Sequence, residues 1–369
     1  MDHPQVAAFT DTYLPTVNGV TYTVQTWRDK WEQSGGQMDV IYPASKHSPK
    51  SREHAVPSLP LPFYDGFRLG SPRIPGTVSG SDIVHVHTPF GIGLAGARLA
   101  NRQNLPLVVS YHTPTPEYAG YLTESCGLRG VVRTIAARYE KWFLSQADHI
   151  VVPSQHTASQ LSRSENSSIS VISNGVDTEQ FAPVPSEETK ALGEQLSIPE
   201  GPVVGYTGRH GHEKNLETVI DAVAGLDGVN LVLSGDGPAR TTLETRSKEK
   251  GTDAVFPGFL DRAALPAFYS LLDLFVFPSP VETEGLVAME AIACGTPVIG
   301  VEDGALGETI TDGKTGYTVH SGDTAAFRAA IRRGLETKES LSAHCLDCRS
   351  ELDVSNSIKK LRRLYGRLC

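Results

Sequence analysis

No stretch of the 369 residues is long and apolar enough to cross a membrane, because such a helix needs roughly 20 consecutive apolar residues. The first five residues also show neither the basic start nor the apolar core of a signal peptide. These two absences argue against helical membrane spans and secretion. We therefore expect a cytoplasmic protein.

Cysteine is scarce and irregularly spaced. The five cysteines are Cys126, Cys294, Cys345, Cys348 and Cys369. The Cys-x-x-Cys spacing after His344 suggests metal or redox chemistry, but no second pair occurs at a matching spacing, so a zinc ion would lack ligands. We interpret these residues as ordinary reduced thiols.

Positive charge is also in deficit, with a formal net charge of −9. Residues 1–180 hold 14 Lys and Arg against 15 Asp and Glu, whereas residues 181–369 hold 19 against 27. This balance argues against nucleic-acid binding. An anion site in the second half would have to be built from specific local groups, because its overall charge repels anions.

The length exceeds what one hydrophobic core usually supports, so two domains are expected. A strand, loop and helix series begins near residue 6, and a second series begins at residue 203. The first lacks the Gly-x-Gly-x-x-Gly fingerprint of dinucleotide-binding domains, which disfavours a nicotinamide enzyme. We predict domains over 1–180 and 201–349, joined by a Pro- and Glu-rich linker at 181–200.

Residues 272–301 predict a strand, a loop, a helix and a second strand. Such a unit places the helix N-terminus at the carboxyl edge of a parallel sheet, where backbone N–H groups attract an anion. Glu282 lies just before the helix and Glu290 on its second turn. Two interpretations remain open for this pair. Both carboxylates recognise hydroxyl groups, or Glu282 is a favourable N-terminal charge and Glu290 a solvated helix residue.

Two predicted strands of the first half end in a histidine, at His87 and at His112. His112 is the better site candidate, because the loop after it carries Tyr118 and Tyr121, which suit contact with a sugar or acceptor. We interpret His87 as a packing or supporting residue.

A helix predicted over 127–146 has a basic side and an apolar side. The basic residues are Arg129, Arg133, Arg138 and Lys141. We expect the apolar stripe to pack on the helix's own sheet; it consists of Val131, Val132, Ile135, Tyr139, Trp142 and Phe143. The basic side is either an ordinary solvated face or a surface that docks on anionic lipid headgroups.

Several short motifs follow one another along nearly the whole chain. They are Asn174-Gly175-Val176-Asp177, Gly208-Arg209 with Glu213-Lys214-Asn215, Gly235-Asp236-Gly237-Pro238, Gly258-Phe259, and Glu282 with Glu290. With these motifs the chain resembles the retaining glycosyltransferases of family 4, the group 1 glycosyl transferases. The resemblance implies the α/β fold named GT-B, with two Rossmann-like doubly wound domains facing across a cleft. It also implies that the C-terminal helix, at about 350–369, crosses back to the first domain.

The resemblance implies transfer of a hexosyl group from a nucleoside-diphosphate sugar to a hydroxyl acceptor, with retention. Arg209 and Lys214 would hold the diphosphate, with the backbone N–H groups of Gly285 and Leu286 nearby. These cations can stabilise the leaving group without a metal, and the chain has no Asp-x-Asp pair. No cofactor or metal is expected beyond the donor substrate.

The remaining donor contacts implied by the resemblance come from both halves. Glu290 would bind the nucleotide ribose and Glu282 the hydroxyls of the transferred sugar. From the first domain, His112 would touch the donor sugar and Gly19 would lie near the diphosphate.

The chain departs from the family pattern at two places. Glu284 stands where relatives usually have Phe, which makes the loop more acidic. His210 and His212 lie between the two cations; they either contact phosphate when protonated or belong to an exposed loop.

Residues 11–20 and 110–113 resemble most closely the family members that glycosylate lipids, of the mannosyl and sulfoquinovosyl type. This implies a lipid or glycolipid acceptor and peripheral contact with the anionic inner face of the cell membrane. Base, sugar and acceptor stay open. Two rivals are a GT-B UDP-sugar 2-epimerase, which the sequence around Arg209 and Lys214 disfavours, and an inactive nucleotide-binding subunit. The intact Arg209, Lys214, Glu282 and Glu290 argue against the second rival.

Overall fold

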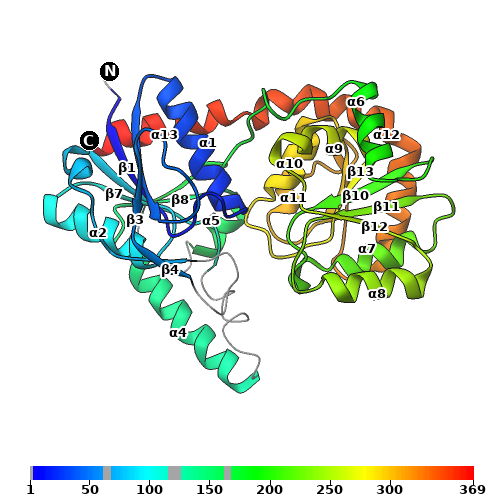
Figure 1. The fold of residues 1–369 in the computed structure, drawn as a ribbon, viewed down its shortest axis with the longest axis horizontal. Coiled ribbons are helices and arrows are strands. Elements are labelled where there is room, and N and C mark those ends of the chain that lie inside the picture. Colours follow the sequence, from blue (N-terminus) through cyan, green and yellow to red (C-terminus); the bar gives the residue numbers. More distant parts are fainter. Residues whose placement is uncertain (1–2, 61–67, 115–125, 162–167) are drawn as a thin grey trace. The chain divides into compact units, whose positions relative to one another are not determined.

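The structure is a computed structural model that describes residues 3–60, 68–114, 126–161 and 168–369, without the side chains of 126–129. The chain divides into two units (Figure 1). Unit 1 contains residues 1–174 and 354–369, and unit 2 contains residues 175–353. Each unit is built on its own parallel β-sheet.

Unit 1 has a seven-stranded sheet in which every neighbouring pair is parallel. In spatial order its strands are β3 (Glu53–Val56), β2 (Gln37–Pro43), β1 (Gln5–Phe9), β6 (Ile83–Val86), β7 (Leu107–Ser110), β8 (His149–Val152) and β9 (Ser168–Val171). Its helices are α1 (Gly19–Gln33), α2 (Gly91–Gln103), α4 (Cys126–Leu144), α5 (Gln155–Leu161) and α13 (Val354–Leu368). A short antiparallel pair, β4 (Ser58–Pro60) and β5 (Arg68–Gly70), lies outside this sheet.

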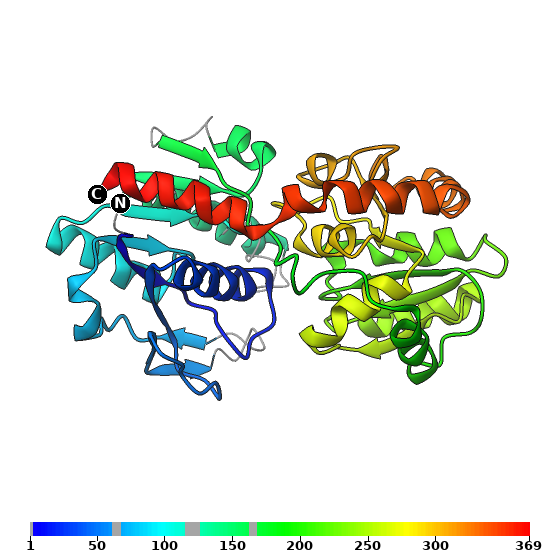
Figure 2. The ribbon, with the colours of Figure 1, turned by 90° about the horizontal axis from the view of Figure 1, so that it is seen from above.

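Successive strand residues of unit 1 point to opposite faces of the sheet, and both faces are covered. On one face Val6, Ala8 and Val108 pack with residues of α1 and α13. On the other, Phe9 and Val86 pack with residues of α2, α5 and the end of α4. Helix α13 lies beside α1 (Figure 2), so the predicted return of the C-terminal helix to the first half is confirmed.

Unit 2 repeats this architecture with a six-stranded parallel sheet. In spatial order its strands are β12 (Val255–Gly258), β11 (Asn230–Ser234), β10 (Val203–Thr207), β13 (Leu274–Phe277), β14 (Val298–Val301) and β15 (Gly316–Val319). Its α-helices are α6 (Ser186–Gln195), α7 (Leu216–Val223), α8 (Arg240–Lys250), α9 (Leu265–Leu271), α10 (Leu286–Ala293), α11 (Leu306–Thr309) and α12 (Thr324–Leu352).

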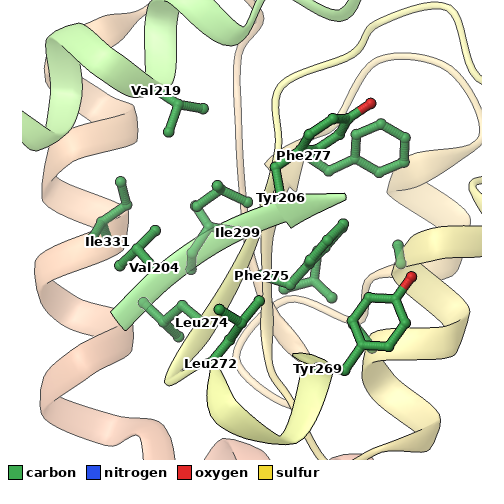
Figure 3. Packing of buried hydrophobic residues seen from close by; sticks show 14 of the residues in the cluster. Val204, Tyr206, Val219, Tyr269, Leu272, Leu274, Phe275, Phe277, Ile299 and Ile331 are labelled. Carbon is green, nitrogen blue, oxygen red and sulfur yellow. The ribbon is translucent and has the colours of Figure 1, made fainter. Parts of the chain in front are cut away.

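The central strands of unit 2 are buried on both faces, as their continuous apolar runs predict. Tyr206, Phe275 and Phe277 form an aromatic group at the meeting of β10 and β13 (Figure 3). Ile331 of α12 packs in the same cluster. This core holds the carboxyl ends of β10 and β13 rigidly side by side.

The segment 181–200, expected as a linker, lies within unit 2. Phe181 is fully buried in its core, and α6 packs against α9. The Pro and Glu content of this segment reflects a short surface helix whose ends are anchored by apolar residues.

Candidate functional site

The polar residues of unit 2 gather at the carboxyl edge of its sheet. Arg209 follows β10, Lys214 ends a short 3-10 turn, and Glu282 lies in the loop after β13. Because β10 and β13 are adjacent and parallel, these loops meet at one edge. The predicted strand, loop and helix unit therefore brings Glu282 beside the cations of the preceding motif.

Two glycine positions let the loop backbones approach closely at this edge. Gly235 has a φ of +117°, and a Cβ there would lie 1.9 Å from the carbonyl oxygen of Gly208. Gly285 caps α10 with a φ of +88°, and a Cβ would lie 2.6 Å from Leu306. Both positions favour glycine because left-handed backbone and steric crowding coincide there. Because Gly285 caps α10, the first backbone N–H groups of this helix lie at the same edge of the sheet.

The two cations of the site are each paired with a carboxylate. The Nζ of Lys214 lies 2.5 Å from Oε1 of Glu282, and the side chains are 18% and 15% exposed. Arg209 forms an ion pair with Glu213. Lys214 also lies 5.7 Å from the centroid of the Phe277 ring. The ion pairs hold both cations at the edge even though unit 2 carries excess negative charge.

Glu290 is buried rather than solvated, so the interpretation of this residue as an exposed helix position is wrong. Its Oε2 accepts a 2.8 Å hydrogen bond from the Tyr269 hydroxyl, and its Oε1 lies 3.2 Å from Nη1 of Arg262. Burial raises the pKa of the Glu290 carboxyl, while Arg262 and Tyr269 oppose that shift. Arg262 in turn stacks over the Phe181 ring, at 4.9 Å from its centroid. A carboxylate has about four lone-pair positions, so it can accept further hydrogen bonds beside these two.

Sequence reasoning did not find Arg262 or Tyr269. They lie 28 and 21 residues before Glu290, on segments that carry no motif. The one available signal was an Arg just before the short apolar helix α9 and a Tyr within it, immediately before the strand of the motif.

The structure shows how far the residues at the two departures from the family pattern are buried. Glu284 is 5% exposed and therefore buried. His210 is fully buried and its Nε2 lies 3.2 Å from the carbonyl oxygen of Ser234. Burial lowers the pKa of His210, which keeps the ring neutral. Both expectations for His210, phosphate contact as a cation and an exposed loop position, are therefore wrong, whereas His212 is exposed.

Unit 1 brings three histidines together beneath α1. His87 Nδ1 lies 3.0 Å from His112 Nε2, and the two rings stack with centroids 5.3 Å apart. The His85 and His87 rings are tilted against each other with centroids 4.2 Å apart, and Trp27 lies beside all three rings. His87 and His112 also line a cavity of about 30 Å³ together with Phe90. Burial lowers the pKa of His112 to about 4.

Gly19 is exposed and is the first residue of α1. The preceding Asn18 caps this helix, because its side chain accepts a 2.9 Å hydrogen bond from the N–H of Thr21. Gly19 and His112 lie in unit 1, whereas the other predicted donor-binding residues lie in unit 2. Tyr118 and Tyr121 fall outside the described residues, as does the side chain of Arg129.

Asp11 links two elements of unit 1 through hydrogen bonds, a role that the motif around it did not predict. Its carboxylate accepts hydrogen bonds from the backbone N–H groups of Ile92, at 2.8 Å, and Gly93, at 3.2 Å. The Thr88 hydroxyl donates to it at 2.8 Å. Asp11 therefore ties the end of β1 to the first turn of α2, where an acidic group is favoured.

Helix α4 differs from the expectation that its apolar stripe packs on the sheet. Val131, Ile135 and Trp142 are 56%, 62% and 51% exposed. Among the described side chains of α4, Phe143 and Leu144 at its end are buried in the core. The rest of α4 extends away from the sheet (Figure 1). The expectation is therefore wrong for Val131, Ile135 and Trp142, whereas Phe143 packs in the core as expected.

Among the residues that the structure describes, no group of three or more His, Cys, Asp or Glu side chains is arranged to hold a metal ion. Within the same residues, no helix combines the length and apolarity of a membrane span.

Comparison with known proteins agrees with this arrangement. The family model described as Glycosyltransferase Family 4 matches residues 17–180, and that described as Glycosyl transferases group 1 matches residues 188–345. The GDP-mannose-dependent alpha-mannosyltransferase of Mycolicibacterium smegmatis is 32% identical over 339 residues, which cover 89% of this chain and 86% of the relative. The alpha-monoglucosyldiacylglycerol synthase of Streptococcus pneumoniae is 26% identical over 381 residues, covering 98% and 85%.

The fold also matches solved structures. The sucrose-phosphate synthase of Thermosynechococcus elongatus superposes with a TM-score of 0.79 at 23% identity, over 99% of both chains. At that identity the match shows the fold, and the expected GT-B class is confirmed. The chain belongs to glycosyltransferase family 4, the group 1 glycosyl transferases, and is a retaining hexosyltransferase that uses a nucleoside-diphosphate sugar.

Proposed function

We propose that unit 2 binds the donor through the group formed by Arg209, Lys214, Glu282, Glu290 and the start of α10. The observation that carries this proposal is the Lys214–Glu282 pair, held beside the N-terminus of α10. An incoming diphosphate would replace Glu282 as the partner of Lys214. The freed Glu282 carboxylate would then accept hydrogen bonds from hydroxyls of the transferred sugar.

The diphosphate would be stabilised by three kinds of group. Lys214 supplies a point charge and Arg209 a planar set of donors. The backbone N–H groups of Gly285 and Leu286 add the positive end of the helix dipole. Together these groups favour the diphosphate most strongly as it leaves with its full negative charge, which is when stabilisation accelerates transfer.

In the transfer step the acceptor oxygen bonds to the anomeric carbon while the bond from that carbon to the diphosphate breaks. The electron pair of the broken bond stays with the diphosphate, and the acceptor proton passes to one of its oxygens. Attack from the face that the diphosphate leaves gives retention. His112 would contact the donor sugar and Gly19 would lie near the diphosphate.

We further propose a lipid or glycolipid acceptor. The relative from Streptococcus pneumoniae is named for the synthesis of a glucosyldiacylglycerol. Helix α4 supports the same proposal, because exposed apolar side chains beside exposed Arg133, Arg138 and Lys141 suit the interface of an anionic bilayer. The occupant of this face would be the membrane surface that carries the acceptor.

The acceptor and donor are tested by a product screen. The purified protein is incubated with GDP-mannose, UDP-glucose or a dTDP-sugar, with and without a lipid extract, and products are identified by mass. We expect a hexose added to a lipid in one donor arm. Conversion of a UDP-sugar to its epimer without any acceptor would instead support the epimerase, and transfer only to soluble acceptors would refute the lipid proposal.

Membrane contact through α4 predicts a defined response to two sets of substitutions. Replacing Val131, Ile135 and Trp142 with Ser should abolish most binding to anionic vesicles, since apolar insertion is lost. Replacing Arg133 and Arg138 with Ala should lower the partition coefficient about 30-fold, because each cation is worth about 1 kcal/mol near such a surface. Vesicle flotation measures both effects.

Leu59→Ser provides the matched control for α4. Leu59 is 72% exposed on β4 of the same unit, so its replacement removes apolar surface elsewhere. This variant should float like the wild type. If the wild type and both α4 variants float equally, the exposed stripe does not contact the membrane.

A further inference from the structure

The contact between His87 and His112 arises from the register of two neighbouring strands. His87 directly follows β6, and His112 lies two residues beyond β7. These strands pair in parallel, with Val86 opposite Val109, so the two residues leave the sheet at the same edge. The 3.0 Å separation of His87 Nδ1 and His112 Nε2 is that of a hydrogen bond.

Only one of these two nitrogens can carry the shared proton. Burial lowers the pKa of His112 to about 4, and it lowers that of His87 well below the ordinary value. Both rings are therefore neutral near pH 7, with a single N–H each. The hydrogen bond runs either from His87 to His112 or in the reverse direction, and each direction fixes the tautomer of both rings.

The second nitrogen of His87 distinguishes the two directions. His87 Nε2 is buried and has no hydrogen-bond partner among the described residues. If His112 donated, the proton of His87 would have to sit on this nitrogen, as a buried N–H without an acceptor. Such orphaned N–H groups are rare in folded proteins. If His87 Nδ1–H donates to His112 Nε2 instead, no N–H of His87 is left buried without an acceptor.

The neighbouring His85 is satisfied by other groups. Its Nδ1 lies 2.6 Å from the Tyr365 hydroxyl of α13, and its Nε2 lies 2.8 Å from Oγ of Ser110. His85 therefore contributes packing under His87, with ring centroids 4.2 Å apart, and does not compete for its nitrogens. The tilted His85 ring occupies one side of His87.

We infer that His87 is a positioning residue, whose Nδ1–H holds His112 in the tautomer that carries its proton on Nδ1. The inference rests on the proposed contact of His112 with the donor sugar. In this tautomer Nδ1 is the donor atom of the His112 ring, so an oxygen of the sugar would accept from it. The reverse tautomer would turn Nδ1 into an acceptor, so the direction of a hydrogen bond between this nitrogen and the sugar would be reversed.

The tautomer can be measured without any substrate, by long-range ¹⁵N–¹H correlation spectra of protein labelled at histidine. The His112 signals are assigned by their loss in His112→Gln. We expect the Nδ1–H tautomer in the wild type. In His87→Phe, which keeps a stacked ring but has no donor, His112 should shift toward a tautomer mixture. His87→Asn, whose side-chain amide can donate from nearly the position of Nδ1, should restore the wild-type spectrum.

Turnover supplies the second readout. In His87→Phe, kcat should fall about 10- to 100-fold, by analogy with the loss seen when the partner that orients a metal-binding histidine is removed. KM for the nucleotide sugar should change less, and His87→Asn should recover most of kcat. His149→Phe is the matched control, because His149 is a buried strand histidine of the same sheet bonded to Ser170 instead. It should leave the His112 tautomer and kcat unchanged.

Each outcome has a distinct meaning. An Nε2–H tautomer for His112 in the wild type, or a tautomer that His87→Phe does not alter, overturns the inference. A tautomer that shifts while kcat stays normal supports the hydrogen-bond direction and instead refutes the contact between His112 and the donor sugar.

Discussion

Lys214→Ala is expected to lower kcat/KM by about 10²- to 10³-fold while the protein stays folded, which is the typical loss for one preorganised group that stabilises charge in a transition state. Two effects combine. The variant loses the cation that meets the leaving diphosphate, and it leaves the Glu282 carboxylate uncompensated at the position where that anion arrives. Steady-state kinetics with the donor found in the product screen measures the loss.

The control for Lys214 is another lysine of unit 2 in a similar ion pair. The Nζ of Lys338 lies 2.5 Å from Oδ1 of Asp273, away from the loops that carry the site. Lys338→Ala should retain normal turnover. A Lys214→Ala/Glu282→Ala double variant should bind the nucleoside diphosphate, which carries no sugar, more tightly than Lys214→Ala, because the repulsive carboxylate is gone. Near-normal turnover of Lys214→Ala would refute the diphosphate assignment.

Glu290→Gln is expected to raise the dissociation constant of the nucleoside diphosphate at least about tenfold, since hydrogen bonds to a charged group are worth about 1.5–3 kcal/mol. Gln keeps the shape and an acceptor for Tyr269, so less of the buried cluster is disturbed than with Ala. Titration calorimetry measures the affinity.

The ribose contact is tested more directly with a 2′,3′-dideoxynucleoside diphosphate. The wild type should bind this analogue less tightly than the natural ligand, whereas Glu290→Gln should discriminate less between the two, because a neutral amide forms weaker hydrogen bonds to the hydroxyls than a carboxylate. Tyr269→Phe removes a partner of Glu290 and leaves its charge, so it should retain discrimination against the analogue. Undiminished discrimination in Glu290→Gln would reject the ribose role.

Much of the fold follows from local sequence patterns. The apolar runs 274–277 and 298–301 predict buried strands because both faces of a parallel sheet are covered. Gly285 and Gly235 lie at the predicted turns, where a positive φ favours glycine. The family motifs place the same residues at the carboxyl edge of the sheet, so the Lys214 and Glu282 candidates could be named before any coordinates were known.

The buried polar partners could not be predicted in this way. Arg262 and Tyr269 reach Glu290 from segments without a motif, and Tyr365 meets His85 across 280 residues of sequence. A hydrogen bond forms between side chains that the fold brings within about 3 Å, and residue spacing along the chain does not encode that distance. His210 shows the same limit, because its neighbours along the chain are polar but its ring is fully buried beside Tyr206 and Phe256.

The sequence by itself determined the two series of strands and helices, the family motifs and the residue types of the donor site, because backbone preference and apolar periodicity act over a few neighbouring residues. The tertiary structure decided which polar groups are neutralised or held in place. It paired Lys214 with Glu282, buried Glu290, set His87 against His112 and left the α4 stripe exposed. Burial and charge pairing depend on contacts between distant segments, so only the assembled fold determines them.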